Sequence, residues 1–176
     1  MQHSKVQKGV IVGGGTAGWM AAASLAKLVG KNLHVTLVES DEIGTVGVGE
    51  ATIPTLLTLH ELLKIKEQDF VAAVQGTFKL GISFENWRNV GEDYIHSFGY
   101  TGKDCWAAGF QHFWLKGKQL GLSEEFGNYC TELVAAKDKR FAVLPNNGLN
   151  YAYHFDASLY AKFLRGIAED NGALRQ

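Results

Sequence analysis

Three glycines near the start of the chain have the spacing of a phosphate-binding loop. Gly13, Gly15 and Gly18 form a G-x-G-x-x-G pattern between an apolar run at residues 8–12 and an alanine-rich segment. Such glycines allow a tight turn, a close approach of the backbone to a pyrophosphate, and close packing of helix on strand. The following helix N-terminus offers N–H groups and a positive partial charge to phosphate oxygens. The pattern therefore predicts binding of an adenine dinucleotide, either FAD or NAD.

Glu39 supplies the acid that this kind of site uses. It ends a second apolar run, residues 34–38, and lies about 20 residues beyond the last glycine, where a carboxylate accepts a hydrogen bond from a ribose hydroxyl. A carboxylate there disfavours a 2′-phosphate, because two anions would face each other. The alternative is a glycine-rich turn that only lets a helix pack closely on a sheet.

A second glycine-rich stretch, residues 44–49, precedes a predicted helix. Gly44, Gly47 and Gly49 leave one side of this loop without bulk, so a flat ring or a phosphate could lie against its backbone. Apolar residues within it, such as Val48, could instead simply anchor a surface loop. The spacing by itself leaves both interpretations open.

Lys79 carries the amine with the greatest chemical interest. It lies in a predicted strand at residues 77–87, where apolar residues alternate with Lys79, Gly81 and Ser83. Most lysines on the polar face of a strand are solvated. The functional alternative is an amine on a rigid strand, beside two small residues that leave room for a cavity.

Two other residue pairs could do chemistry but have common structural explanations. His96 and Phe98 share one face of a predicted strand at residues 93–99 and could hold a flat aromatic ligand, although a core aromatic beside a hydrogen-bonded histidine is commoner. His154 and Asp156 could form a catalytic pair. Asp156 is explained more simply as the N-cap of a helix that begins at the next residue.

The elements that position these residues follow an α/β order. We predict strands at residues 8–12, 34–38, 77–87, 93–99 and 151–155, with a further strand beginning at residue 173. We predict helices at residues 17–29, 55–63, 67–75, 109–120, 128–137 and 157–170. The helix at 109–120 is expected to bury an apolar face of ordinary core type. This order favours a doubly wound parallel sheet whose next strand is missing.

Composition limits the classes of function. The 176 residues are 46% hydrophobic and 20% charged, with a formal net charge of −1, which fits about one ordinary globular domain. This charge offers no field for nucleic acid or an anionic membrane. Cys105 and Cys130 lack metal-ligand spacing, and the N-terminus lacks the apolar core of a signal peptide. We therefore expect a cytoplasmic protein without a metal site, whose reduced thiols are buried or inert.

Four segments together resemble the N-terminal part of the flavin-dependent tryptophan halogenases. They are the glycine loop at 13–20, the stretch 47–54, the strand 78–87 and residues 154–156. The resemblance covers nearly the whole chain and implies an α/β, Rossmann-like FAD-binding domain of the flavin monooxygenase type. Residues 1–176 would form the N-terminal part of a single halogenase module. The family's Trp-x-Trp-x-Ile-Pro signature is absent, so we expect this domain to be incomplete at its C-terminus, with later segments missing.

The resemblance implies FADH2-dependent chlorination or bromination of an aromatic substrate such as tryptophan or indole. Hypohalous acid, formed from O2 and chloride or bromide, would be activated by Lys79 through a hydrogen bond or as a haloamine. A separate NAD(P)H-dependent flavin reductase would supply the reduced FAD, and a homodimer is left open. Two alternatives are a related FAD-dependent aromatic monooxygenase, in which Lys79 is structural, and a truncated, non-catalytic FAD-binding module.

The resemblance also implies three sets of site residues beside Lys79. The ADP half of FAD would be held by Gly13, Gly15, Thr16, Ala17, Gly18 and Glu39. The flavin side would be approached by a mobile strap that contains Val48, Gly49, Glu50, Ala51 and Thr52. The pocket for the aromatic substrate would be lined by Ile82, His96 and Phe98.

Overall fold

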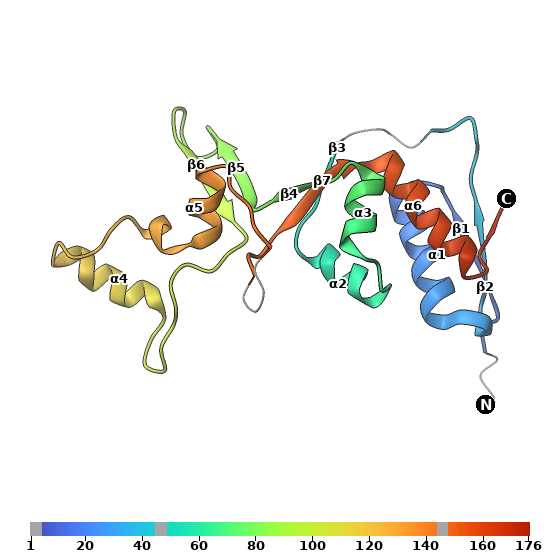
Figure 1. Ribbon diagram of the computed structural model, residues 1–176, viewed down its shortest axis with the longest axis horizontal. Coiled ribbons are helices and arrows are strands. Elements are labelled where there is room, and N and C mark those ends of the chain that lie inside the picture. The colour runs from blue at the N-terminus through green and yellow to red at the C-terminus, as the bar shows by residue number, and fades with distance from the viewer. Residues whose placement is uncertain (1–4, 45–48, 144–147) are drawn as a thin grey trace. The chain divides into compact units, whose positions relative to one another are not determined.

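The chain forms two compact units. The computed structural model describes residues 5–44, 49–143 and 148–176. The first unit contains the residues up to Thr77 together with Tyr153–Gln176, and the second unit is Phe78–Ala152. In Figure 1 the blue and red ends of the chain both belong to the first unit, although they are far apart in the sequence.

The first unit begins with the predicted strand, helix and strand. β1 (Lys8–Val12) runs parallel to β2 (His34–Val38), with Lys8 opposite His34 and Val12 opposite Val38. Between them, α1 (Thr16–Val29) ends at Gly30, whose φ of +62° is readily adopted by glycine. A 3₁₀ turn, η1 (Gly30–Asn32), then returns the chain to β2. This parallel arrangement confirms the predicted β-α-β order.

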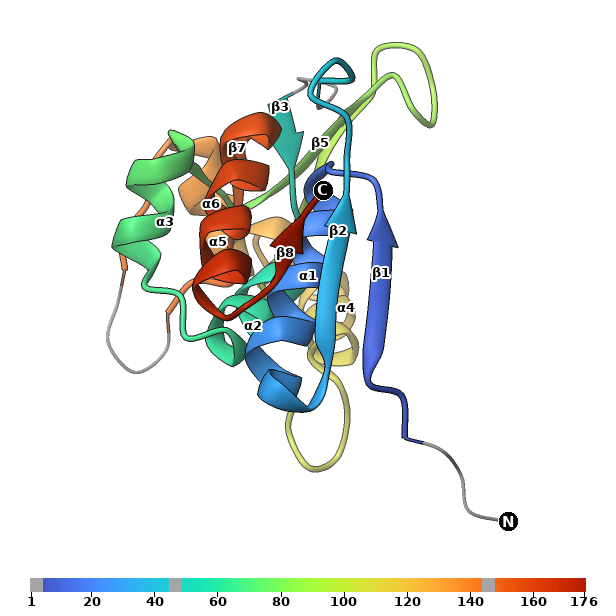
Figure 2. The same cartoon turned by 90° about the vertical axis from the view of Figure 1, so that its right-hand side faces the viewer.

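A third strand and a second helix complete this layer. α6 (Ala157–Asp170) leads into β8 (Leu174–Arg175), which pairs parallel with the other side of β2. In Figure 2 the sheet β1-β2-β8 lies in front of α1 and α6, which cover the same face. The two helices pack against each other, and many of their buried residues are small: Ala22, Ala23, Ala26, Ala157, Ala161 and Ala168. The first unit is thus Rossmann-like, as predicted, but its helices cover one face of the sheet rather than the two faces of a doubly wound sheet.

The opposite face of this sheet exposes apolar side chains. Val10 is 67% exposed, Val12 84% and Leu174 61%. Inward-facing Val35 and Leu37 on β2 are instead almost fully buried against the helices. The hydrophobic interior of the first unit therefore lies on the helix side of its sheet.

An aromatic cluster forms a second part of the same interior. α2 (Thr55–Leu62) and α3 (Glu67–Val74) pack near β7 (Ala152–Asp156), which pairs antiparallel with β3 (Gly49–Ala51). At the centre of the cluster lies the Phe70 ring, fully buried. Ring centroids within 4.4 to 5.5 Å of it belong to His60, Tyr153, Phe155 and Tyr160. Their edge-to-face contacts are the favoured geometry for aromatic pairs.

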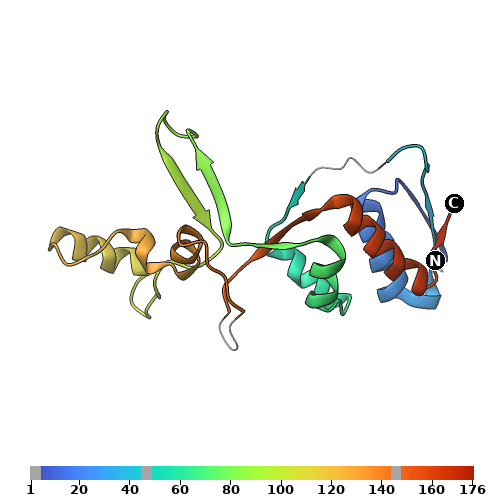
Figure 3. The same ribbon diagram turned by 45° about the horizontal axis from the view of Figure 1, so that its top comes forward.

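The second unit contains an antiparallel hairpin, whose two strands lie side by side in Figure 3. The hairpin consists of β5 (Gly81–Glu85) and β6 (Asp93–Ser97). The prediction of one strand across residues 77–87 is wrong, because β4 (Thr77–Lys79) ends before Leu80 and belongs to a different sheet from β5. At the other end, Asn86 with a φ of +56° terminates β5.

The remaining helices of the second unit are short and shallow. α4 (Phe110–Gln119) occupies the predicted place but has no buried residue, and Phe113 is 51% exposed. The prediction that this helix buries an apolar face in the core is therefore wrong. In place of one helix at 128–137, the chain forms a 3₁₀ turn, η2 (Phe126–Tyr129), and then α5 (Thr131–Lys137). The extended backbone at Cys130, with a ψ of 113°, separates them.

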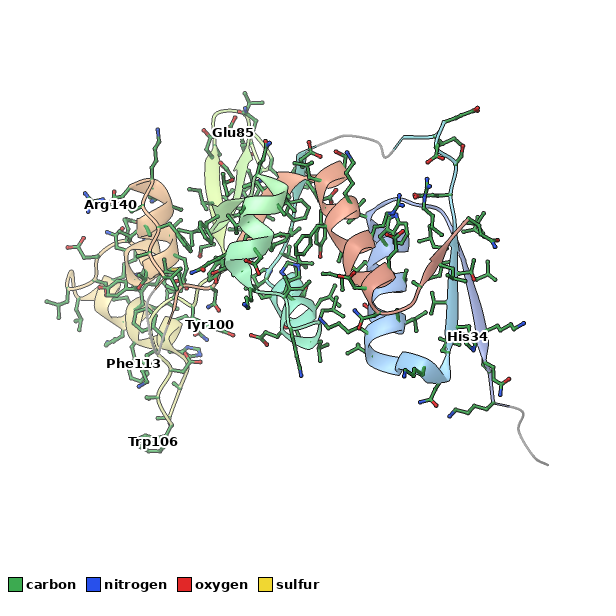
Figure 4. The ribbon with its side chains drawn as sticks, turned by 45° about the vertical axis from the view of Figure 1, so that its right-hand side comes forward. His34, Glu85, Tyr100, Trp106, Phe113 and Arg140 are labelled. Atoms are coloured by element: carbon green, nitrogen blue, oxygen red, sulfur yellow. The ribbon has the colours of Figure 1, made fainter. Side chains whose placement is uncertain are left out.

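The loop before α4 lies in solvent. Trp106 is fully exposed and lies at the tip of that loop (Figure 4). The face of α4 that does make contacts uses Phe110 and Trp114, whose rings pack locally against Phe126 of η2. Among the described residues, no helix has both the length and the apolar character needed to cross a lipid bilayer.

Candidate functional site

The glycine loop has the geometry that its spacing predicts. Gly13 has a φ of +114°, and its N–H donates to the carbonyl of Val38 at 2.9 Å, which joins the turn to the end of β2. A Cβ atom on Gly18 would overlap the carbonyl oxygen of Gly13. Gly18 is therefore needed for the close packing of α1 on the turn, whereas Gly13 is needed for the turn itself.

A cavity of about 680 Å³ lies at this end of the sheet. It is lined by Val12, Gly13, Gly14, Gly15, Thr16, Val38, Glu39, Ser40, Ile43, Gly44, Glu50 and Ala157. Of the residues expected to bind the ADP half, Gly13, Gly15, Thr16 and Glu39 line it. Ala17 and Gly18 belong to the first turn of α1 and are not among these lining residues. The fold thus gathers the loop and the acid around one cavity.

Glu39 is held by side chains that the sequence analysis did not identify. Its Oε1 accepts a hydrogen bond from Arg175 Nε at 2.5 Å and lies 3.8 Å from an Arg165 nitrogen. Its Oε2 accepts from Trp19 Nε1 at 3.3 Å. A Cβ atom on Gly14 would overlap the carboxylate. Gly14, which we had not assigned a role, therefore leaves the space in which the acid lies.

The second glycine-rich stretch is only partly described. Val48 lies outside the described residues, while Gly49, Glu50 and Ala51 form β3 and pair with β7. Glu50 lines the cavity of the glycine loop. Ala51 and Thr52 line a neighbouring cavity of about 320 Å³ together with Met20, Glu50, Ile53, Thr55, Leu56 and Leu59. Of the residues expected to approach the flavin, Glu50, Ala51 and Thr52 thus border a cavity, and Gly49 lines neither of the two.

Lys79 is buried in the second unit. Its side chain lies at the end of β4, and the residue is 7% exposed. The Nζ atom lies 5.5 Å from the centroid of the Phe98 ring, within the range of a cation–π contact. Burial lowers the pKa of this amine from its ordinary value of 10.5. The more common outcome for a lysine in a strand, a solvated side chain, is therefore excluded.

Of the residues expected to line the substrate pocket, Ile82 and His96 lie on facing strands, and Phe98 follows directly after β6. Ile82 of β5 is directly opposite His96 of β6, and the Phe98 N–H donates to the Leu80 carbonyl at 2.8 Å. Residues opposite each other in an antiparallel pair project from the same face. Ile82 and Phe98 are partly buried and His96 is exposed. The structure thus brings Lys79 to Phe98 and Ile82 to His96.

Gly81 does not leave room for a cavity, which the functional alternative for Lys79 proposed. A Cβ atom there would meet the carbonyl oxygen of His96 and the Cα of Ser97. The space beside Gly81 is filled by the backbone of β6, so the glycine serves close strand approach rather than ligand access.

Two residues at the start of α5 bracket Phe98 and were missed by sequence reasoning. The Cys130 sulfur lies 3.1 Å from Ser97 Oγ, and the buried Glu132 carboxylate fills the space where a Cβ of Gly99 would lie. Glu132 Oε1 also accepts from the Asn150 N–H at 2.8 Å. A lone acid in a short helix gives no sequence signal for such a contact, because burial depends on the fold.

The other candidates have structural explanations. Asp156 caps α6, with Oδ1 accepting from the N–H groups of Ser158 and Leu159 at 2.7 and 3.1 Å, as predicted. The pKa of the Asp156 carboxyl is lowered, first by the hydrogen bond that the Ser158 hydroxyl donates to it and then by the backbone N–H donors. Both cysteines are free thiols; Cys130 is buried as expected, whereas Cys105 is exposed.

The fold and the loop together define a class of protein. A G-x-G-x-x-G turn between parallel strands, with an acid ending the second strand, gives the first unit the architecture of a dinucleotide-binding domain. The model of the family described as tryptophan halogenase matches residues 8–176. The chain belongs to the tryptophan halogenase family.

Individual relatives agree with this assignment. The chain is 38% identical over 193 residues to 7-chloro-L-tryptophan 6-halogenase KtzR of Kutzneria sp. (strain 744), covering 93% of this chain and 36% of the relative. Among solved structures, it matches Xcc4156, a flavin-dependent halogenase from Xanthomonas campestris, with 64% identity and a TM-score of 0.94, covering 98% of this chain and 35% of that one. BrvH, a flavin-dependent halogenase from Brevundimonas sp. BAL3, matches with 38% identity and a TM-score of 0.85, again covering 98% and 35%. The chain therefore spans about a third of the length of the relatives it matches.

Proposed function

We propose that this chain is the part of a flavin-dependent halogenase that binds the adenine half of FAD and carries the amine that delivers the halogen to an aromatic ring. The observation that carries the proposal is the environment of Lys79, whose amine is buried over the Phe98 ring with a lowered pKa. Buried lysines with perturbed pKa values cluster at functional sites.

The residues of the first unit fit FAD. Among the described residues, apart from its two chain neighbours, no atom lies within 4 Å of the place where a Cβ of Gly15 would be, so the loop backbone is open to a pyrophosphate, and Glu39 lines the same cavity. We propose that Gly13, Gly15, Thr16, Ala17, Gly18 and Glu39 hold the ADP half, and that Val48, Gly49, Glu50, Ala51 and Thr52 approach the flavin side. Bound in its reduced form, FAD would supply the two electrons and two protons that, with O2, a halide ion and one further proton, give hypohalous acid and water.

Lys79 can then act in either of two ways. As an ammonium, its N–H hydrogen-bonds the hypohalous acid and makes the halogen more electrophilic. As a neutral amine, it forms an N–halogen bond and releases water, then exchanges the halogen for a proton of the substrate ring. The lowered pKa increases the neutral fraction of the amine, which is the form that the second route requires.

The substrate in this proposal is an aromatic molecule such as tryptophan or indole. KtzR is named for a halogenated tryptophan, and SttH of Streptomyces toxytricini, which is 36% identical, is named a tryptophan 6-halogenase. In this chain, Ile82, His96 and Phe98 would line the pocket and hold one ring carbon toward Lys79. A separate NAD(P)H-dependent flavin reductase would be the partner that supplies reduced flavin.

Mass spectrometry of the reaction products tests the proposal. The longest natural form of the protein is incubated with tryptophan or indole, FAD, NADH, a flavin reductase and bromide. We expect a product with the bromine isotope doublet, reduced about 100-fold or more in Lys79→Ala. Lys118→Ala is the matched control, because Lys118 Nζ also lies over an aromatic ring, 4.9 Å from the Trp114 centroid, but on the exposed surface of α4.

Other products would contradict specific parts of the proposal. A product that gains oxygen, at a rate that survives Lys79→Ala, would identify a monooxygenase. FAD binding without any product across a panel of aromatic substrates would identify a non-catalytic module. Lys79→Arg separates the two roles of the amine, since an arginine stays cationic and can donate hydrogen bonds but cannot serve as a neutral amine.

A further inference from the structure

We propose that Arg175 is a positioning residue for the dinucleotide: its guanidinium holds the Glu39 carboxylate in the orientation that accepts hydrogen bonds from the adenosine ribose. The inference rests on the FAD site of the proposed function. It concerns a residue at the end of β8 that the glycine pattern does not predict.

The carboxylate of Glu39 is held at both oxygens. Arg175 Nε donates to Oε1 at 2.5 Å, and Trp19 Nε1 donates to Oε2 at 3.3 Å. Each carboxylate oxygen can accept a second hydrogen bond, so both retain capacity toward the cavity that Glu39 lines. The two donors therefore fix the direction of the acid without using all of its accepting capacity.

The backbone places Arg175 where it can do this. β8 pairs with β2 so that Arg175 is opposite Leu37, and the Glu39 N–H donates to the Gln176 carbonyl at 2.8 Å. Gly14 lies on the other side of the carboxylate, with no side chain to displace it. The acid is thus confined between the loop and the end of β8.

Arg175 is better suited to this task than Arg165. The Arg165 nitrogen is 3.8 Å from Oε1, and this side chain donates to Glu169 at 2.8 Å. Arg175 instead bridges Glu39 and Asp41, and the hydrogen bonds that it donates to these two carboxylates raise the pKa of its guanidinium. A guanidinium between two acids also has a fixed orientation, because its N–H donors form a planar fork.

Because Arg175 orients the Glu39 carboxylate before the ligand arrives, it should strengthen the binding of FAD. A glutamate side chain that is free to rotate loses this freedom when it engages a ribose, whereas one already fixed does not. The benefit should appear only for a ligand whose ribose has hydroxyls to donate.

The test combines a change in the protein with a change in the ligand. Dissociation constants are measured by quenching of flavin fluorescence for FAD and for a FAD analogue without the 2′- and 3′-hydroxyls of its adenosine ribose. In the full chain, we expect Arg175→Met to raise the dissociation constant of FAD about tenfold and that of the analogue less than about twofold. Arg175→Lys, which keeps the charge but not the planar fork, should give an intermediate loss for FAD.

Arg88→Met is the matched control, because Arg88 is an exposed arginine of the second unit, paired with Glu92. It should leave both dissociation constants unchanged. An equal loss for both ligands in Arg175→Met would mean that Arg175 only supports the fold, and no loss for either would mean that Glu39 needs no support; both results overturn the inference. A wild-type chain that binds no FAD would overturn it together with the cofactor of the proposed function, whereas FAD binding with an unaffected Arg175→Met overturns the inference alone.

Discussion

At the scale of single residues, two glycines of one loop are required for different reasons. Gly15 has an ordinary backbone, with a φ of −73°, and open space where its Cβ would be. Gly18 has no such space, since the carbonyl oxygen of Gly13 occupies it. The first glycine is thus free of structural need and borders the cavity, whereas the second is needed for packing.

This difference predicts that an alanine substitution at Gly15 impairs FAD binding, whereas the same substitution at Gly18 impairs stability. Gly15→Ala should change the free energy of unfolding by no more than about 0.5 kcal/mol, because the weaker N-cap is offset by a less flexible unfolded chain. It should nevertheless weaken the binding of FAD about tenfold or more, because it places a methyl group against the pyrophosphate. Gly18→Ala should cost roughly 1–3 kcal/mol of stability through overpacking. Denaturant titration and flavin fluorescence measure the two effects, and a Gly15→Ala variant with unchanged FAD affinity would exclude the loop as the phosphate site.

At the scale of elements, a buried histidine joins α2 to α6. His60 Nε2 and Tyr160 Oη lie 2.9 Å apart, and His60 is only 4% exposed. Burial lowers the pKa of His60 from 6.5 to about 4, although the nearby Glu67 carboxylate opposes this shift. Burial also raises the pKa of Tyr160. Both groups are therefore neutral in the folded protein at neutral pH.

His60 should make the stability of the chain depend on pH. Its folded pKa lies below its unfolded value, so the unfolded state takes up more protons between pH 6.5 and about 4, and stability is lost as the pH falls through this window. The loss should be at most about 3 kcal/mol. Urea denaturation of the wild type and His60→Gln at pH 7 and pH 4.5 measures it.

The variants separate burial from hydrogen bonding as the cause. His60→Gln should lack this part of the pH dependence. Tyr160→Phe should be less stable at every pH but should keep this pH dependence, because the lowered pKa of His60 arises mainly from burial of its imidazole. A wild type and a His60→Gln variant with the same pH dependence would show that His60 titrates alike in both states.

At the scale of the whole molecule, the chain passes twice between two compact units, at residues 77–78 and 152–153. The glycine loop and Glu39 belong to the first unit, and Lys79 and Phe98 to the second. The proposal that residues 1–176 act as one module therefore requires that two separately packed units work together.

Hydrogen exchange with bound FAD tests how far that cooperation extends. At about 100 times its dissociation constant, FAD should stabilise the unit that binds it by about 2.7 kcal/mol and slow its most protected amides roughly 100-fold. We expect this protection in the first unit, with the second unit exchanging as it does without FAD. Gly15→Ala at the same FAD concentration should lose the protection. Slowing across both units would instead show that the chain unfolds as a single module.

The sequence by itself determined the local elements and the family. The β-α-β order, the Asp156 cap and the bounds of α6 follow from glycine conformation, capping chemistry and apolar periodicity, which are properties of neighbouring residues. The same local information failed where distant contacts decide. It could not show the break at Leu80 or the shallow packing of α4, because these depend on which strands and rings lie nearby.

Only the tertiary structure decided which side chains meet. Arg175 is 136 residues from Glu39, and their ion pair exists because β8 returns beside β2. The burial of Lys79 over Phe98 likewise depends on the turn from β4 into the hairpin, and Glu132 is buried only because Gly99 leaves space for its carboxylate. Spacing along the chain specifies residue types and local geometry, whereas desolvation and the partners of a charge arise from the packing of segments that are remote in sequence.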